Sequence, residues 1–262
     1  MLQASVEKKL MTNFNRGTGL LVIEVCGSNP NGDPDSEGEP RTLGADRRGL
    51  ISPVSFKRKL RDLVADTDGP AWKEAEQKLG LRDGKNGHTY GIVEQPTRKF
   101  EELKKMSSQK FVHSYWDARI FGNTLLEVIK GEAGKMPHFI STGTVQFGPG
   151  VSLAPIDIEY QTWTNKSPVQ EGTQTRGMAP LAWGFVQHAI YTMPFFVNPL
   201  VARKSGCSKN DVELMKFLIP FAYFSDRLGG PPQRAGAARL VQRTQVPSSP
   251  DNSSSVDILR RL

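Results

Sequence analysis

The stretch Ser28–Val64, SNPNGDPDSEGEPRTLGADRRGLISPVSFKRKLRDLV, decides the fold of this 262-residue chain. It follows an apolar run, Gly19–Val25, whose near-continuous hydrophobicity predicts a central β-strand with both faces covered. After a polar loop rich in Gly and Pro, Ser52 as N-cap and Pro53 at the first helical position predict the start of a helix. The apolar residues that recur at the spacing of one helix face, and that we expect to pack against a sheet, are Phe56, Leu60, Leu63 and Val64.

The same stretch is strongly basic. Between positions 41 and 61 there is one acid, Asp46, against seven basic residues, namely Arg41, Arg47, Arg48, Lys57, Arg58, Lys59 and Arg61. A compact cationic run on a loop and a helix beside a sheet predicts contact with a nucleic-acid backbone. The alternative for the helical part is an ordinary solvated face.

The loop that precedes these basic residues partly matches a calcium-binding loop. Asp33, Asp35, Glu37 and Gly38 fit the opening of the EF-hand pattern, but the twelfth position, which must be a bidentate Glu, is Gly44. The Asn-Pro, Asn-Gly and Asp-Pro pairs are typical turn formers. We therefore expect no metal site and no cofactor here.

The composition favours a polyanionic partner. The net charge is +7 and the sequence pI is about 9.4, which suits nucleic acid or an anionic membrane surface. No apolar run approaches the ~18–20 residues of a membrane-spanning helix, and the first residues lack the apolar core of a signal peptide. Two cysteines without metal-ligand spacing are typical of a reducing compartment. We expect a cytoplasmic protein with no membrane partner.

The order of the remaining elements indicates the fold class. Residues 67–113 are charged, helix-prone and broken by Gly, which predicts an inserted lobe. Residues 142–147 alternate in polarity and are expected to form a strand. The polar segment 159–183 joins two strand-like runs, which predicts a hairpin whose arms project roughly 35 Å; a floppy loop is the alternative. A helix from Ser208 and a weak strand near Ala238–Val246 complete a βαββαβ order, which is ferredoxin-like.

Three features carry a family resemblance: NPNGDPD at 29–35, FKRKLRD at 56–62, and YWDARIFG at 115–122, together with the element order. Within the third motif, Asp117 and Arg119 share a face if the segment is a strand, and can pair with each other if it is a loop. Over roughly residues 18–228 the chain resembles the CRISPR-associated backbone subunit of type I Cascade complexes. That family is the repeated, guide-RNA-coating member of the repeat-associated RNA-binding superfamily.

The resemblance implies an α+β fold with a ferredoxin-like (RRM-like) palm, an inserted lobe of helical fingers and a protruding β-hairpin thumb. The first half of the palm is expected at 17–66 and the fingers at 67–140. The second half of the palm is expected at 141–246, with the thumb at about 159–183. A flexible tail is expected at 247–262.

The resemblance also implies a non-catalytic function in antiviral defence. The protein is expected to bind guide RNA, to polymerise head to tail along it with other Cascade subunits, and to present the bases for pairing with target DNA. The residues expected to contact RNA are Asn31, Arg41, Arg47, Arg48, Lys57, Arg58, Arg61 and Arg119. The thumb residues expected to displace bases are Trp163, Lys166, Arg176 and Met178.

Three other functions stay open at the level of sequence. One is a metal-dependent backbone subunit that cleaves target RNA with Asp33 or Asp35. Another is a guide-processing endoribonuclease with His88 or His113 as general base. The last is a basic domain of unrelated function. The four histidines lack convincing metal spacing and no G-x-S-x-G or H-E-x-x-H motif occurs, so we name no catalytic residues.

Overall fold

The computed structural model describes residues 14–81, 88–96, 98, 102–103, 106–123, 141–166, 178–223 and 234–244. The expected thumb residue Arg176, the expected tail at 247–262 and residues 124–140 of the expected fingers lobe lie outside these ranges.

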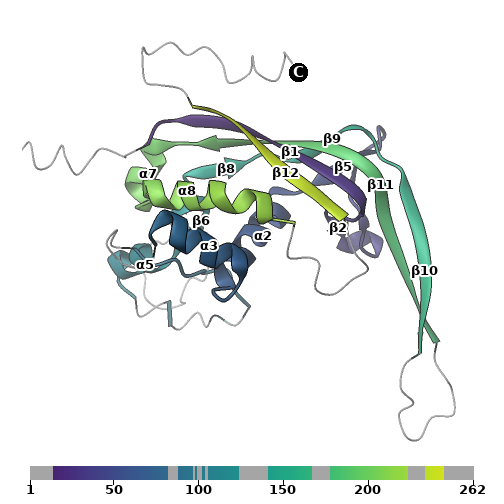
Figure 1. Ribbon diagram of the computed structural model, residues 1–262, viewed down its shortest axis with the longest axis horizontal. Helices are drawn as coiled ribbons and strands as arrows, with labels where there is room; N and C mark the ends of the chain where they lie inside the picture. The colour runs from purple at the N-terminus through teal and green to yellow at the C-terminus, as the bar shows by residue number, and fades with distance from the viewer. Residues whose placement is uncertain are drawn as a thin grey trace, which may run out of the picture.

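One large antiparallel sheet forms the centre of the molecule (Figure 1). Its strands neighbour one another in the order β12-β1-β11-β9-β5-β4, and β8 and β10 also pair with β11. The bounds are β1 Gly17–Ser28, β4 Thr42–Leu43, β5 Arg48–Ile51, β8 Val145–Phe147, β9 Gly150–Pro155, β10 Ile158–Lys166, β11 Met178–Val197 and β12 Arg234–Thr244. Two small pairs lie apart from it, β2 Gly32–Asp33 with β3 Glu39–Pro40, and β6 Gly122–Asn123 with β7 Ser141–Thr142.

The helices α2, α3, α7 and α8 lie on the same side of the large sheet (Figure 1). The helical bounds are α2 Pro53–Ala65, α3 Pro70–Leu79, α5 Ser108–Ser114, α6 Trp116–Phe121, α7 Pro199–Ser205 and α8 Lys209–Leu218, with 3-10 turns η1 Pro34–Ser36 and η2 Ile219–Phe221. None of the helices within the described ranges has the length and apolar character needed to cross a bilayer. The fold is therefore a mixture of helices with an antiparallel sheet, as the sequence predicted at that level.

The central position predicted for β1 is confirmed, but the prediction that both its faces are covered is wrong. β1 lies between β12 and β11, and its pairing with β11 runs from Gly17 opposite Val197 to Ser28 opposite Val186. One face is buried, with Leu21 at 0% exposure, whereas Glu24 on the other face is exposed. The continuous hydrophobicity misled because Leu and Val also occupy the half-exposed outer face, which the helices do not cover.

Helix α2 forms as the sequence predicted. The Ser52 hydroxyl accepts a hydrogen bond from the Ser55 N–H at 3.2 Å, and Pro53 opens the helix. Its predicted apolar face is buried in the main core, where the rings of Phe56 and Phe147 pack edge to face with centroids 5.1 Å apart. The helix is thus fixed against the sheet by the residues that the spacing selects.

The polar segment expected to form a hairpin is a two-stranded ribbon over its described part. β10 pairs with the first part of β11, from Ile158 opposite Val186 to Lys166 opposite Met178. This ribbon, meaning β10 with residues 178–186 of β11, projects away from the body of the sheet (Figure 1). Nine residues per arm at ~3.3 Å per residue correspond to roughly 30 Å.

Candidate nucleic-acid interface

The loop between β1 and β5 is held in place by its own hydrogen bonds. The Asn29 amide donates to the Gly38 carbonyl at 2.6 Å, and the Gly38 N–H donates to the Asp33 carbonyl at 2.7 Å. The Asn31 side-chain oxygen accepts from the Ser52 N–H at 2.8 Å, which ties the loop to the residue that caps α2. The side chain of Asn31, predicted to contact RNA, is therefore engaged in ordering the protein.

Three of the predicted arginines lie on this loop and the strand after it. Arg41 is half-buried, and its guanidinium pairs with the Asp33 carboxylate at 3.3 Å. Arg48 pairs with Asp46 at 3.3 Å, and both side chains are exposed. Arg47 is exposed as well and holds a left-handed backbone conformation with φ of 51°. The end of the loop thus places two neighbouring guanidiniums in solvent.

Arg58 is a further exposed arginine, on helix α2. It is exposed, pairs with Asp62 one turn later at 2.8 Å, and donates to the Glu94 carbonyl at 3.1 Å. Exposed pairs of this kind contribute about 0–1 kcal/mol, so an RNA phosphate can replace the carboxylate at little cost. Arg58 therefore remains available for an anionic partner.

Lys57 is half-buried on the neighbouring side of the helix. Its ammonium lies 5.5 Å from the centroid of the Phe121 ring. Burial lowers the pKa of Lys57, the adjacent Arg61 charge lowers it further, and Glu94 opposes both. Lys57 gains from a nearby anion, because an anion offsets both the burial and the like charge.

Arg61, also predicted to contact RNA, is buried instead, and we correct that prediction. Its side chain is 5% exposed, and it pairs with the Asp117 carboxylate at 3.1 Å and with the Glu94 carboxylate at 3.0 Å. A buried guanidinium that is paired with Asp117 in the core and with the exposed Glu94 above it has no access to an RNA phosphate. Asp117 itself is 2% exposed, so each member of this pair needs the other.

Arg119 is a second correction. Its segment is helix α6 rather than a strand or a loop, and Arg119 does not pair with Asp117. Arg119 is 0% exposed and forms a bidentate pair with Asp211 of α8, at 3.1 Å and 2.8 Å. Its other hydrogen bonds go to backbone carbonyls, those of Val112, His113 and Thr89. The Asp-x-Arg motif is therefore a structural junction.

After these corrections, five cationic side chains remain in the candidate interface, and we call them the cationic surface. Its exposed members are Arg47, Arg48 and Arg58, and its half-buried members are Arg41 and Lys57. They come from the loop before β5, from β5 itself and from the first half of α2, all within the stretch that decides the fold. The arrangement suits a polyanion held by its phosphates.

Three of the predicted thumb residues, Trp163, Lys166 and Met178, belong to the far half of the described ribbon. The strand register places Trp163 opposite Leu181 and Lys166 opposite Met178, at the outermost described pair. The base of the ribbon contacts the same loop that carries the cationic surface: the Asn29 amide donates to the Gly184 carbonyl at 3.4 Å. The loop therefore connects the two candidate RNA-contacting parts.

A family model described as CRISPR-associated protein Cas7 matches residues 15–228 of this chain. The chain belongs to the CRISPR-associated Cas7 family. The family resemblance predicted from the three sequence motifs is thereby confirmed.

One curated relative is the CRISPR-associated protein Cas7 of Haloferax volcanii, 27% identical over 220 residues. The match covers 79% of this chain and 64% of that protein, so the chain spans less than two thirds of its relative's length. A solved chain of a CRISPR RNA-guided surveillance complex, pre-nicking, matches with a TM-score of 0.46 and 15% identity, over 78% of this chain and 69% of that chain. A chain of the Type III-B Cmr-beta bound to cognate target RNA matches with a TM-score of 0.43 and 11% identity, over 93% and 64%. These structural likenesses are too low to carry a functional assignment.

The residues considered as catalytic candidates in this Cas7-family chain are Asp33, Asp35, His88 and His113. Asp33 pairs with Arg41 and accepts the Asp35 N–H at 3.2 Å, which orders the turn η1. The rings of His88 and His113 lie 6.1 Å apart; burial lowers the pKa of His88, and the Arg119 charge lowers it further. Within the described ranges, no three His, Cys, Asp or Glu side chains group closely enough to hold a metal ion.

The buried role of Arg61 predicts a stability effect that an exposed arginine lacks. Arg61→Met is expected to lower the free energy of unfolding by about 3 kcal/mol or more, because it leaves the Asp117 carboxylate in the core without its cation. The matched control Arg58→Met, one turn earlier and exposed, is expected to change it by less than about 0.5 kcal/mol. Urea unfolding of the purified variants measures both, and equal losses would contradict the assignment.

Proposed function

We propose that this chain is a non-catalytic backbone subunit that binds guide RNA in a CRISPR RNA-guided antiviral complex. In this proposal the cationic surface holds the RNA phosphates, and the ribbon of each copy crosses the RNA tract of its neighbour. The bases left exposed then pair with target DNA, so that base pairing supplies the specificity. The observation that supports it most is a set of exposed arginines on α2 and on a loop that contacts the base of a projecting ribbon, in a chain of the Cas7 family.

The strand order supports reading the body as a ferredoxin-like palm. In a βαββαβ unit with β1, β9, β11 and β12 as its four strands, the observed neighbours put the fourth strand beside the first, then the third, then the second. We interpret residues 17–66 and 141–246 as this palm, 67–140 as the fingers, and the ribbon as the thumb. The thumb residues Trp163, Lys166, Arg176 and Met178 belong to this proposal.

The expected RNA affinities favour assembly of many copies over binding by a single subunit. Five cations that neutralise about four phosphates give a salt slope of about −3 on single-stranded RNA, so that one copy binds weakly at physiological salt. Contacts between adjacent copies convert later binding into a nearly intramolecular step, which raises the effective affinity about 10²–10⁴-fold. Head-to-tail contacts that do not close into a ring generate a helical filament.

Reversing the exposed cations tests the RNA-binding surface. The triple variant Arg47→Glu, Arg48→Glu, Arg58→Glu is expected to lower RNA affinity strongly and to reduce the salt slope by about 2, because about 0.7 is lost per phosphate contact. The charge-matched control is Arg203→Glu, Lys204→Glu, Lys209→Glu on exposed positions of α7 and α8, away from β5 (Figure 1). Fluorescence anisotropy of a labelled single-stranded RNA across a salt series measures both. Equal losses in the two variants would reject the surface. Arg61 is excluded from the variant because its reversal would disrupt the core.

Shortening the ribbon tests the thumb. Gln161 and Trp183 are opposite each other in the register, so residues 162–182 can be replaced by Asn-Gly, which favours a two-residue hairpin turn. The variant is expected to bind a short RNA as the wild type does, but to lose regular spacing on a long one. Nuclease footprinting of the assembled particles measures the spacing, and an unchanged periodic footprint would reject the thumb role.

The absence of catalysis is tested on the assembled complex. Wild-type complex, incubated with complementary RNA and Mg²⁺, is expected to leave that RNA intact, as are Asp33→Ala and Asp35→Ala complexes. In this chain Asp33 is engaged with Arg41, which is consistent with a structural role. Cleavage at regular intervals that disappears in either Asp variant would replace the non-catalytic proposal with the metal-dependent alternative.

A further inference from the structure

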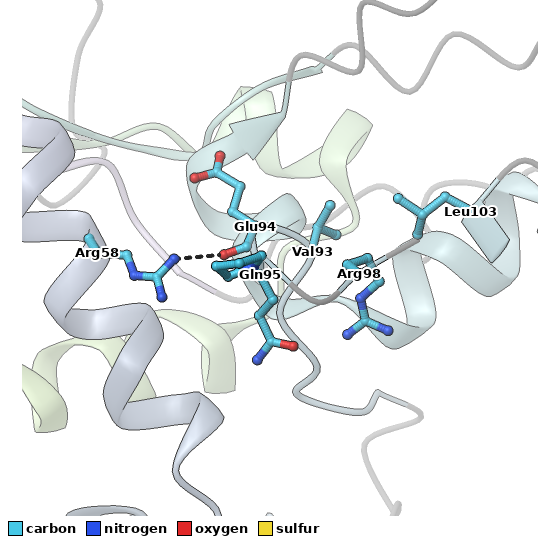
Figure 2. A pocket seen from close by; sticks show the side chains of 7 residues that line it. Arg58, Val93, Glu94, Gln95, Arg98 and Leu103 are labelled. Atoms are coloured by element: carbon cyan, nitrogen blue, oxygen red, sulfur yellow. Dashed lines mark hydrogen bonds between the residues drawn. The ribbon is translucent and has the colours of Figure 1, made fainter. Parts of the chain in front are cut away.

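A pocket of about 380 Å³ lies between α2 and the segment that follows α3, beside the cationic surface (Figure 2). Its size falls within the range of small-ligand sites, roughly 300–1,000 Å³. The residues that line it are Arg58, Val93, Glu94, Gln95, Pro96, Arg98 and Leu103. No predicted site residue other than Arg58 belongs to it, and the sequence predicts only an inserted lobe over residues 67–113.

The lining combines an apolar wall with hydrogen-bonding groups. Val93 and Leu103 are buried, at 6% and 3% exposure, and form the wall together with Pro96. Figure 2 shows Gln95 and Arg98 extending to one side of the segment and the Glu94 carboxylate extending to the other. The polar groups on the side of Gln95 are therefore its own amide and the Arg98 guanidinium, which suit a polar ligand with an anionic group.

The pocket is built on fixed backbone. The buried Asp117 carboxylate accepts the N–H groups of Val93 and Glu94, at 2.9 Å and 3.2 Å. The Arg58 guanidinium donates to the Glu94 carbonyl at 3.1 Å, as the dashed line in Figure 2 marks. The Gln95 N–H closes a tight turn onto the Val93 carbonyl at 2.8 Å. A site whose walls are already ordered loses little entropy when a ligand enters.

Arg98 has donor capacity that its described surroundings leave unused. One of its terminal nitrogens donates to the Ile92 carbonyl at 2.8 Å, and its guanidinium lies over the Tyr115 ring at 5.0 Å. Its Nε is buried and, among the described residues, has no acceptor. A planar guanidinium has a second face, on which a nucleobase can stack. The half-buried guanidinium therefore suits a ligand with a flat ring.

We propose that this pocket binds one unpaired nucleotide of the RNA that crosses the cationic surface. The base packs against Val93, Pro96 and Leu103, and the Gln95 amide hydrogen-bonds its edge. Arg58 and Arg98 contact the phosphate or stack on the ring. A nucleotide is favoured over a protein side chain because Arg58 belongs both to the cationic surface and to the pocket, so a strand held by its phosphates passes the pocket mouth. This inference rests on the proposed RNA-binding function.

Crosslinking tests it on the full-length protein. The protein is loaded with single-stranded RNA that carries one 4-thiouridine at successive positions, irradiated, and digested for mass spectrometry. Crosslinks to the peptide that contains residues 93–98 are expected for a subset of positions. Gln95→Trp, which fills the pocket from its half-buried rim, is expected to abolish those crosslinks and to weaken RNA binding about tenfold. Gln109→Leu, an exposed glutamine on α5, is the control and is expected to change neither.

The possible outcomes distinguish a failure of the pocket inference from a failure of the proposed RNA-binding function. RNA that binds with wild-type affinity and salt dependence but crosslinks only elsewhere overturns the pocket and leaves the function standing. If RNA binding shows no dependence on the cationic surface, the function itself fails, and the pocket inference falls with it.

Discussion

The buried Asp117 carboxylate is the interaction on which the arrangement of the helical layer depends. It accepts from Arg61 of α2 and from two backbone N–H groups of the 88–96 segment. Two residues later Arg119 reaches the opposite way, to Asp211 of α8 and to the carbonyls at the end of α5. The six-residue helix α6 thus joins two helices and a loop through two ion pairs. Removing one member of either pair leaves an uncompensated charge in the core, which is costly.

The same interaction divides the charges of α2 between two roles. Arg61 turns inward to Asp117, whereas Arg58, nearly one turn earlier, stays in solvent. Because Asp117 also fixes the backbone of Val93 and Glu94, it sets the wall of the pocket that Arg58 borders. The buried Asp117 carboxylate therefore fixes the orientation of α2, which turns Arg58 outward, and also the backbone of the pocket beside Arg58.

The sequence predicted the parts of this structure that depend on neighbouring residues. The cap at Ser52, the apolar face of α2 and the strand β1 all follow from spacing within one element. The burial of Arg61 and Arg119 could not be predicted from the sequence. Their acid partners lie 56 and 92 residues away, and only the tertiary fold brings them together. The pocket was missed for the same reason, since Gln95 and Arg98 meet Arg58 only after α6 has drawn their segment against α2. The order of the long strands along the chain was predictable because each strand is marked by its own local pattern of apolar residues.

The strand β11 has a mechanical consequence. It runs unbroken for 20 residues, from the tip of the ribbon at Met178 to Val197 beside β1. Where the ribbon leaves the sheet, Gly184 lies so close to Pro40 that an added Cβ would meet the proline ring at 3.3 Å. One strand therefore joins the ribbon to the middle of the sheet, and any residue larger than Gly at position 184 would push the base of the ribbon away from the loop that carries Pro40.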